Sequence, residues 1–117
     1  MNITEIYLKN IEKNGEDYQL GMAMEECAEL IQAINKWKRN DKMITKMDNL
    51  LEEIADVDIM LDQLKLITNQ AHLIEEIKQQ KILRLKGRLW IWIKYKKGSL
   101  DFYKLAHQYI LVEQFIV

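Results

Sequence analysis

The amino-acid sequence predicts an all-α fold, a bundle of about four to five helices that forms a single domain over residues 1–117. The chain contains no proline and only four glycines, whereas sandwiches and barrels use more of both residues in their turns. Hydrophobic residues make up 49% and charged residues 30%, the ordinary balance of a folded globular protein. No uncharged apolar run approaches the roughly 18 residues of a membrane span. A single cysteine cannot form an internal disulfide and is typical of a reducing, cytoplasmic setting.

The first two helices are expected in the N-terminal third of the chain. The first runs from about Thr4 to Asn14 and ends at Gly15, because glycine takes a left-handed cap conformation at little cost. The second runs from about Asp17 to Arg39 and ends at a polar pair, Asn40–Asp41. These two segments predict a short helix followed by a long one.

The later helices are expected to follow with short connections. The third starts near Thr45 or Asp48 and continues to about Ile67, and the pair Thr68–Asn69 is expected to cap a fourth helix over about residues 70–97. The fourth helix includes a β-prone stretch at residues 90–93, which are Trp-Ile-Trp-Ile. After a break at residues 98–99, a fifth helix is expected up to the C-terminus.

Charges of opposite sign are separated along the chain. Residues 1–77 hold 8 basic and 16 acidic residues, whereas residues 78–97 hold eight basic residues and no acid. Three interpretations are open: a surface for nucleic acid, a phosphate-facing helix of an enzyme, or a solvated face without a role. The charge run alone does not decide among them.

Two acids of the third predicted helix lie on a face that should be buried. At 100° per residue, Glu53 points almost directly away from the charged arc of this helix, and Asp56 lies one turn further along the same side. Their neighbours on that face include Leu50, Val57 and Met60. Their spacing of three residues places both carboxylates on one face.

The second predicted helix repeats this pattern. Glu26 lies among the apolar Met22, Leu30 and Ala33, and Glu29 falls on the border between the apolar and the polar face. Burying an unpaired carboxylate costs several kcal/mol of folding free energy, so buried carboxylates are paired, protonated or bound to a metal.

Two partners for these four acids are consistent with the sequence. One is a buried salt-bridge network with the cations of the fourth helix, of which Lys81, Arg84 and Arg88 share a face. The other is a divalent cation held by oxygen ligands and facing a cationic row that binds phosphate. One cysteine and two distant histidines offer no zinc site, and a ferritin-like di-iron site would need a Glu-x-x-His motif that is absent.

The acid pairs also carry a family resemblance. Glu26-Cys27-Ala28-Glu29 followed by Glu53-Ile54-Ala55-Asp56 resembles the Glu-x-x-Glu and Glu-x-x-Asp signature of the MazG-like, all-α nucleoside triphosphate pyrophosphohydrolases, in particular their small phage-type members. The later Lys81-Ile82-Leu83-Arg84-Leu85 is similar to the basic segment that often follows these motifs. The resemblance covers about residues 17–89 and leaves residues 90–117 as an atypical C-terminal extension.

The resemblance implies hydrolysis of a nucleoside triphosphate to the monophosphate and pyrophosphate, for sanitising or balancing nucleotide pools. It implies Mg²⁺, with Mn²⁺ as a substitute, held by the catalytic acids Glu26, Glu29, Glu53 and Asp56, and substrate phosphates bound by Lys81 and Arg84. It further implies a homodimer or homotetramer. The residues themselves predict a cytoplasmic protein without a membrane partner, and the apolar context of Lys81 and Arg84 argues against a nucleic-acid partner. The alternative is a non-enzymatic helical module that binds nucleic acid or another partner through residues 78–97, and a relative that has lost activity is a third interpretation.

Overall fold

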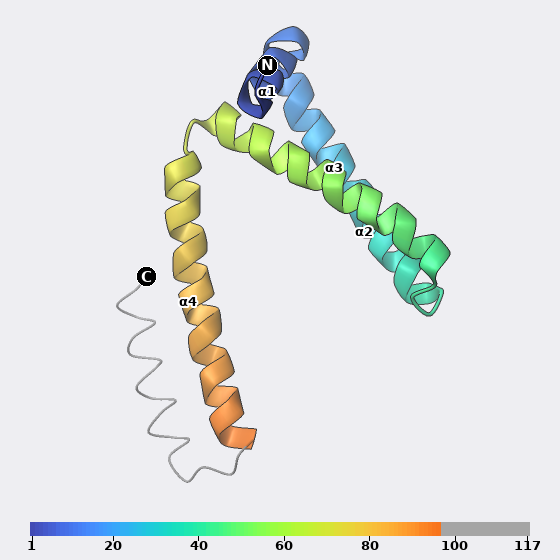
Figure 1. The fold of residues 1–117 in the computed structure, drawn as a ribbon, viewed down its shortest axis with the longest axis vertical. Coiled ribbons are helices and arrows are strands. Elements are labelled where there is room, and N and C mark those ends of the chain that lie inside the picture. Colours follow the sequence, from blue (N-terminus) through green and yellow to red (C-terminus); the bar gives the residue numbers. More distant parts are fainter. Residues whose placement is uncertain (97–117) are drawn as a thin grey trace. The chain divides into compact units, whose positions relative to one another are not determined.

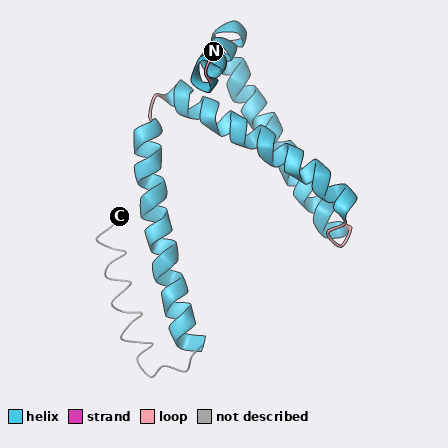
Figure 2. Cartoon of the chain, in the orientation of Figure 1, coloured by secondary structure: helices cyan, strands magenta, loops and turns pink. Residues whose placement is uncertain are grey.

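The computed structural model describes residues 1–96, and Figures 1 and 2 show this part of the chain as ribbon. Residues 1–96 form four α-helices and no strand, which confirms the predicted all-α fold. They are α1 (Ile3–Asn14), α2 (Glu16–Arg39), α3 (Ile44–Thr68) and α4 (Ala71–Lys96). The β-prone residues 90–93 belong to α4, and the expected fifth helix lies outside the described residues.

Both ends of α1 are capped by residues suited to the task. The Asn2 side chain accepts a hydrogen bond from the backbone N–H of Glu5 at 2.8 Å, and the Glu5 carboxylate accepts one from the backbone N–H of Asn2 at 3.4 Å. At the other end, Gly15 has φ of 91° and its N–H donates to the carbonyl of Ile11 at 2.8 Å. The predicted end of α1 at Gly15 is confirmed, but ψ of 151° places Gly15 outside the left-handed helical conformation that the sequence predicts. Its φ still strains any residue with a Cβ.

The residues between α3 and α4 differ in role from the prediction. Thr68 and Asn69 end α3, whereas the sequence predicts that they cap the start of α4. The Thr68 hydroxyl donates to the carbonyl of Leu64 at 2.9 Å, which keeps Thr68 inside α3, and Asn69 adopts the left-handed conformation with φ of 53°. Asparagine tolerates this conformation better than most residues, so it serves as a C-terminal cap.

The chain forms two compact units, and each is described by itself. The first, Met1–Ala71, contains α1, α2 and α3, and the second begins at His72 and contains α4. Within residues 1–96, no helix is both long enough and apolar enough to span a membrane.

In the first unit, α2 and α3 form an antiparallel hairpin, and α1 contacts both of them (Figure 1). The connection between α2 and α3 is short, and Asp41 and Lys42 in it have positive φ values of 52° and 59°. The buried apolar side chains along the hairpin are Ala23, Ala33, Leu50 and Met60.

A cluster of amide side chains joins the three helices of the first unit. The Gln19 side chain donates to the Gln63 side-chain oxygen at 2.6 Å, and Asn10 donates to the same oxygen at 3.2 Å. Asn14 donates to the Gln19 side-chain oxygen at 3.5 Å. Gln19 and Gln63 are each only 3% exposed. We call Asn10, Asn14, Gln19 and Gln63 the amide cluster; it lies where α1 meets the start of α2 and the end of α3.

Candidate metal centre

The acids of α2 are placed by a row of residues that faces α3. Gln19, Glu26 and Ala33 follow one another at intervals of seven residues, which nearly repeats the same direction on a helix. Gln19 and Ala33 are buried and Glu26 is half-buried, so the predicted inward position of Glu26 is confirmed. Glu29 is also half-buried, which agrees with its predicted place at the border of the two faces.

The acids of α3 differ from each other in burial. Glu53 is half-buried, between the buried Leu50 and Met60 along the helix, as the sequence predicts. Asp56 is exposed, although its predicted position is on the buried face. The half-buried Val57 lies nearer the middle of the interface, and Asp56 lies at its edge, where solvent reaches the carboxylate.

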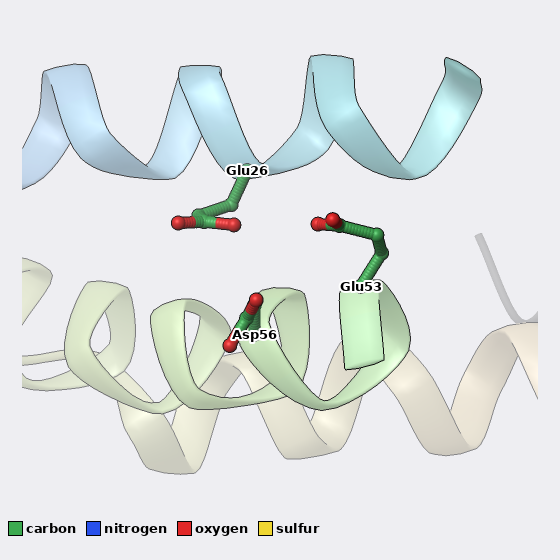
Figure 3. A group of neighbouring side chains, drawn as sticks. All are labelled: Glu26, Glu53 and Asp56. Carbon is green, nitrogen blue, oxygen red and sulfur yellow. The ribbon is translucent and has the colours of Figure 1, made fainter. Parts of the chain in front are cut away.

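Three of the four predicted acids converge in space. Glu26 from α2 and Glu53 and Asp56 from α3 each offer one carboxylate oxygen, and these oxygens all lie within 4.8 Å of one another. Figure 3 shows the Glu26 side chain extending from one helix toward the two side chains of the other. Glu29 is not one of these three, but its negative charge acts on both Glu26 and Glu53. We call these four residues the acidic cluster.

The acidic cluster is electrostatically unfavourable without a cation. Desolvation raises the pKa of Glu26 above its ordinary value of 4.5, and the negative charges of Glu29, Asp56 and Glu53 raise it further. Desolvation likewise raises the pKa of Glu53, followed by the charges of Glu29 and Asp56. Because both pKa values are raised, Glu26 and Glu53 keep their protons to higher pH than isolated glutamic acids do.

The geometry and donor set of the cluster fit a hard divalent cation. The Oε2 atoms of Glu26 and Glu53 are buried and accept no hydrogen bond within the described structure. Mg²⁺ binds carboxylate oxygens at about 2.0–2.1 Å, so two of its ligands on opposite sides lie about 4.2 Å apart. The 4.8 Å span of the three oxygens is close to this distance. One cation bound by the three carboxylates would offset the repulsion among the acids.

The predicted phosphate-binding residues belong to the second unit. Lys81 is exposed and Arg84 half-buried on α4, and the Arg84 Nε has no hydrogen-bond partner within the described structure. Both residues therefore lie on one helix, at the predicted spacing of three residues. Their convergence on the acidic cluster stays a prediction.

Sequence reasoning did not single out the amide cluster. A usable signal was nevertheless present, because Gln19 lies seven residues before Glu26 and Gln63 lies seven residues after Asp56. Two polar residues on the same helix rows as the acids indicate that polar contacts continue along the interface. The alanine, leucine and methionine neighbours obscure that signal, because they make the face appear apolar on average.

The raised pKa values predict how the stability of the protein depends on pH. A carboxyl whose pKa is higher in the folded than in the unfolded state stabilises the fold fully below about pH 4.5, and this contribution is lost as pH rises through the folded-state pKa. Without divalent cations, we expect the melting temperature of the parent to fall relative to that of Glu53→Gln as pH rises from about 4.5 to 8. With Mg²⁺, the stabilisation of the parent should grow over the same range, because the cation displaces protons. Thermal melts in matched buffers measure both trends; parallel curves for parent and variant would contradict the assignment.

The chain matches no family model, no curated protein and no solved structure. The likeness to MazG-like enzymes therefore remains a prediction that rests on the motif residues of α2 and α3.

Proposed function

We propose that this protein is a Mg²⁺-dependent pyrophosphohydrolase that converts a nucleoside triphosphate to its monophosphate and pyrophosphate in the cytoplasm. The observation that supports the proposal best is the meeting of Glu26, Glu53 and Asp56 within 4.8 Å, with buried carboxylate oxygens that lack partners. Structural acids are normally paired with cations, whereas these acids face one another. The motif likeness of these helices to MazG-like enzymes supplies the substrate class.

A divalent cation at this site would polarise the phosphoryl oxygens of the substrate and orient a water for attack. Glu26, Glu53 and Asp56 are the residues that would hold it. As the water oxygen bonds to the α-phosphorus and the bond to the pyrophosphate leaving group breaks, the water must lose a proton. Glu29 is half-buried, and its charge acts on Glu26 and Glu53 without its being one of the three converging acids. We assign to its carboxylate the acceptance of that proton.

The leaving pyrophosphate bears several negative charges that need compensation in the transition state. We assign this role to Lys81 and Arg84. Arg84 supports the assignment, because it is half-buried and its Nε has a free donor that an anion can accept from.

The test is release of pyrophosphate from each common ribonucleoside and deoxyribonucleoside triphosphate, with Mg²⁺ and with a chelator. We expect pyrophosphate and monophosphate in equal amounts, with turnover only when the cation is present. Release of orthophosphate, or turnover that survives the chelator, would contradict the proposed reaction. Cation binding without turnover on any nucleotide would identify the chain as an inactive relative.

We also propose that the protein is a homodimer or homotetramer. The first unit has a shallow apolar groove of about 630 Å³, and such surfaces are typically covered by another protein chain. Leu51 and Ile59 of α3 are exposed as well, at 55% and 42%. The groove is lined by Leu20, Ala23, Met24, Cys27, Ala28, Ile31 and Leu64.

Light scattering over a dilution series should give a mass of two or four times 14.0 kDa. Ile31→Glu, which introduces a charge into the groove, should lower the mass without loss of helix content, because an unpaired carboxylate is costly in an apolar interface. The matched control is Gln32→Glu, at the neighbouring exposed position. A mass near 14 kDa for the parent at micromolar concentration would contradict the proposed assembly.

A further inference from the structure

The amide cluster and the acidic cluster lie on the same interface between α2 and α3. Gln19 precedes Glu26 by seven residues on α2, and Gln63 follows Asp56 by seven residues on α3. Seven residues return a helix to nearly the same face after about 10.5 Å. Because α2 and α3 are antiparallel (Figure 1), one register of the two helices satisfies both pairings, Gln19 with Gln63 and Glu26 with Asp56.

Apolar packing in this interface discriminates weakly between registers. Hydrophobic contacts are non-directional, and the buried residues that α2 contributes include Ala23 and Ala33, which present only a methyl group each. A slip by one helical turn, about 5.4 Å, exchanges one set of such contacts for another. The same slip exceeds the 4.8 Å span of the three carboxylate oxygens and would separate Glu26 from its partners.

The amide pair, in contrast, depends strongly on register. Gln19 and Gln63 are each 3% exposed and share a hydrogen bond of 2.6 Å. In a slipped register both amides would stay in the interface but lose this bond, and a buried amide without a partner is not compensated by water. Asn10 of α1 also donates to Gln63, so a slip of α3 would break a second contact. Buried polar pairs are known to set register in this way between packed helices.

We propose that Gln19 and Gln63 are positioning residues whose hydrogen bond selects the register of α2 against α3 in which Glu26 meets Glu53 and Asp56. The inference rests on the proposed function, since it concerns a cation bound at the acidic cluster. Both glutamines act at a distance of about two helical turns, through the helices and not through contact with the cation.

The test replaces both glutamines in the full chain, as Gln19→Met with Gln63→Met, and measures binding of Mn²⁺ by electron paramagnetic resonance. Methionine has a similar length and shape, and removal of both partners leaves no unpaired amide from the pair, so the melting temperature should stay within a few degrees of the parent value. The dissociation constant for Mn²⁺ should rise at least about tenfold, because the competent register would fall to about a tenth of the population. A purely structural role would leave the Mn²⁺ affinity unchanged wherever the melting temperature is unchanged.

Two further variants make the result decisive. Gln32→Met removes an exposed glutamine of α2 and should alter neither the melting temperature nor the affinity for Mn²⁺. Gln19→Met alone leaves the bond from Asn10 to Gln63 in place, and it decides the question if the double variant does not fold. The inference is overturned if the folded double variant binds Mn²⁺ as tightly as the parent. If the double variant does not fold, the same result for the folded single variant overturns it. A parent chain that binds no Mn²⁺ overturns the proposed function instead, and the inference with it.

Discussion

Glu53→Gln is expected to lower Mg²⁺-dependent pyrophosphate release about 1,000-fold or more, and to leave the fold intact or more stable. The Glu53 Oε2 is buried without a partner, and the carboxyl faces Glu26 and Asp56 across the helix pair. An amide of the same shape removes one negative charge from this group, which stabilises the metal-free protein. The amide is also a poorer ligand than a carboxylate for a hard cation, so it removes the cation binding on which turnover depends.

The matched control is Glu52→Gln, which changes the exposed neighbouring acid on α3. Thermal melts with and without Mg²⁺ should show a cation-induced rise for the parent and for Glu52→Gln, and little or none for Glu53→Gln. Retention of both turnover and the cation-induced rise by Glu53→Gln would show that the metal centre is assigned to the wrong residues.

Replacing Lys81 and Arg84 together by glutamine is expected to lower kcat/KM about 100-fold while the Mg²⁺-induced rise in melting temperature is retained. The two positive charges compensate the leaving pyrophosphate in the proposed reaction, and neither belongs to the acidic cluster. The variant thus separates cation binding from phosphate binding. Steady-state kinetics and thermal melts on the same preparation measure the two effects.

The control for this variant replaces Lys78 and Lys86, which are exposed on the same helix. In an enzyme, the control should keep nearly full turnover. In a nucleic-acid-binding module, both variants should instead lose affinity for an oligonucleotide by similar amounts, and the affinity should fall steeply with salt concentration. Equal loss of oligonucleotide binding with no pyrophosphate release would favour the alternative function of residues 78–97.

The helices and the positions of the acidic cluster follow largely from local patterns in the sequence. Helical periodicity and Gly15 as a cap predict α1 and α2 to within about one residue, because both depend on neighbours along the chain. The inward positions of Glu26 and Glu53 are predictable, because a helical wheel of a single helix already places each charge on an apolar face. The structure confirms the positions and the partial burial of Glu26 and Glu53. Their role in catalysis stays a proposal.

The features that the sequence does not predict depend on contacts between helices. Gln63 is buried because Gln19 and Asn10 from two other helices satisfy its amide, and a single helical wheel contains no information about such partners. Asp56 is exposed whereas its neighbour Val57 is half-buried, and which of the two lies deeper in the interface depends on how the helices pack. Thr68 is the exception, because its hydroxyl donates to the carbonyl of Leu64 within α3, a local bond that its sequence position leaves open.

The short connection between α2 and α3 has a consequence for folding kinetics. Chains whose contacts are mostly local in sequence fold quickly, because little loop entropy is lost before the contacts form. The α2–α3 hairpin is such a unit, and all four members of the acidic cluster belong to it. Like charges therefore meet when the hairpin closes, and we expect their repulsion to slow that step. A divalent cation that removes the repulsion would accelerate folding as well as stabilise the folded state, so refolding rates should depend on Mg²⁺ concentration.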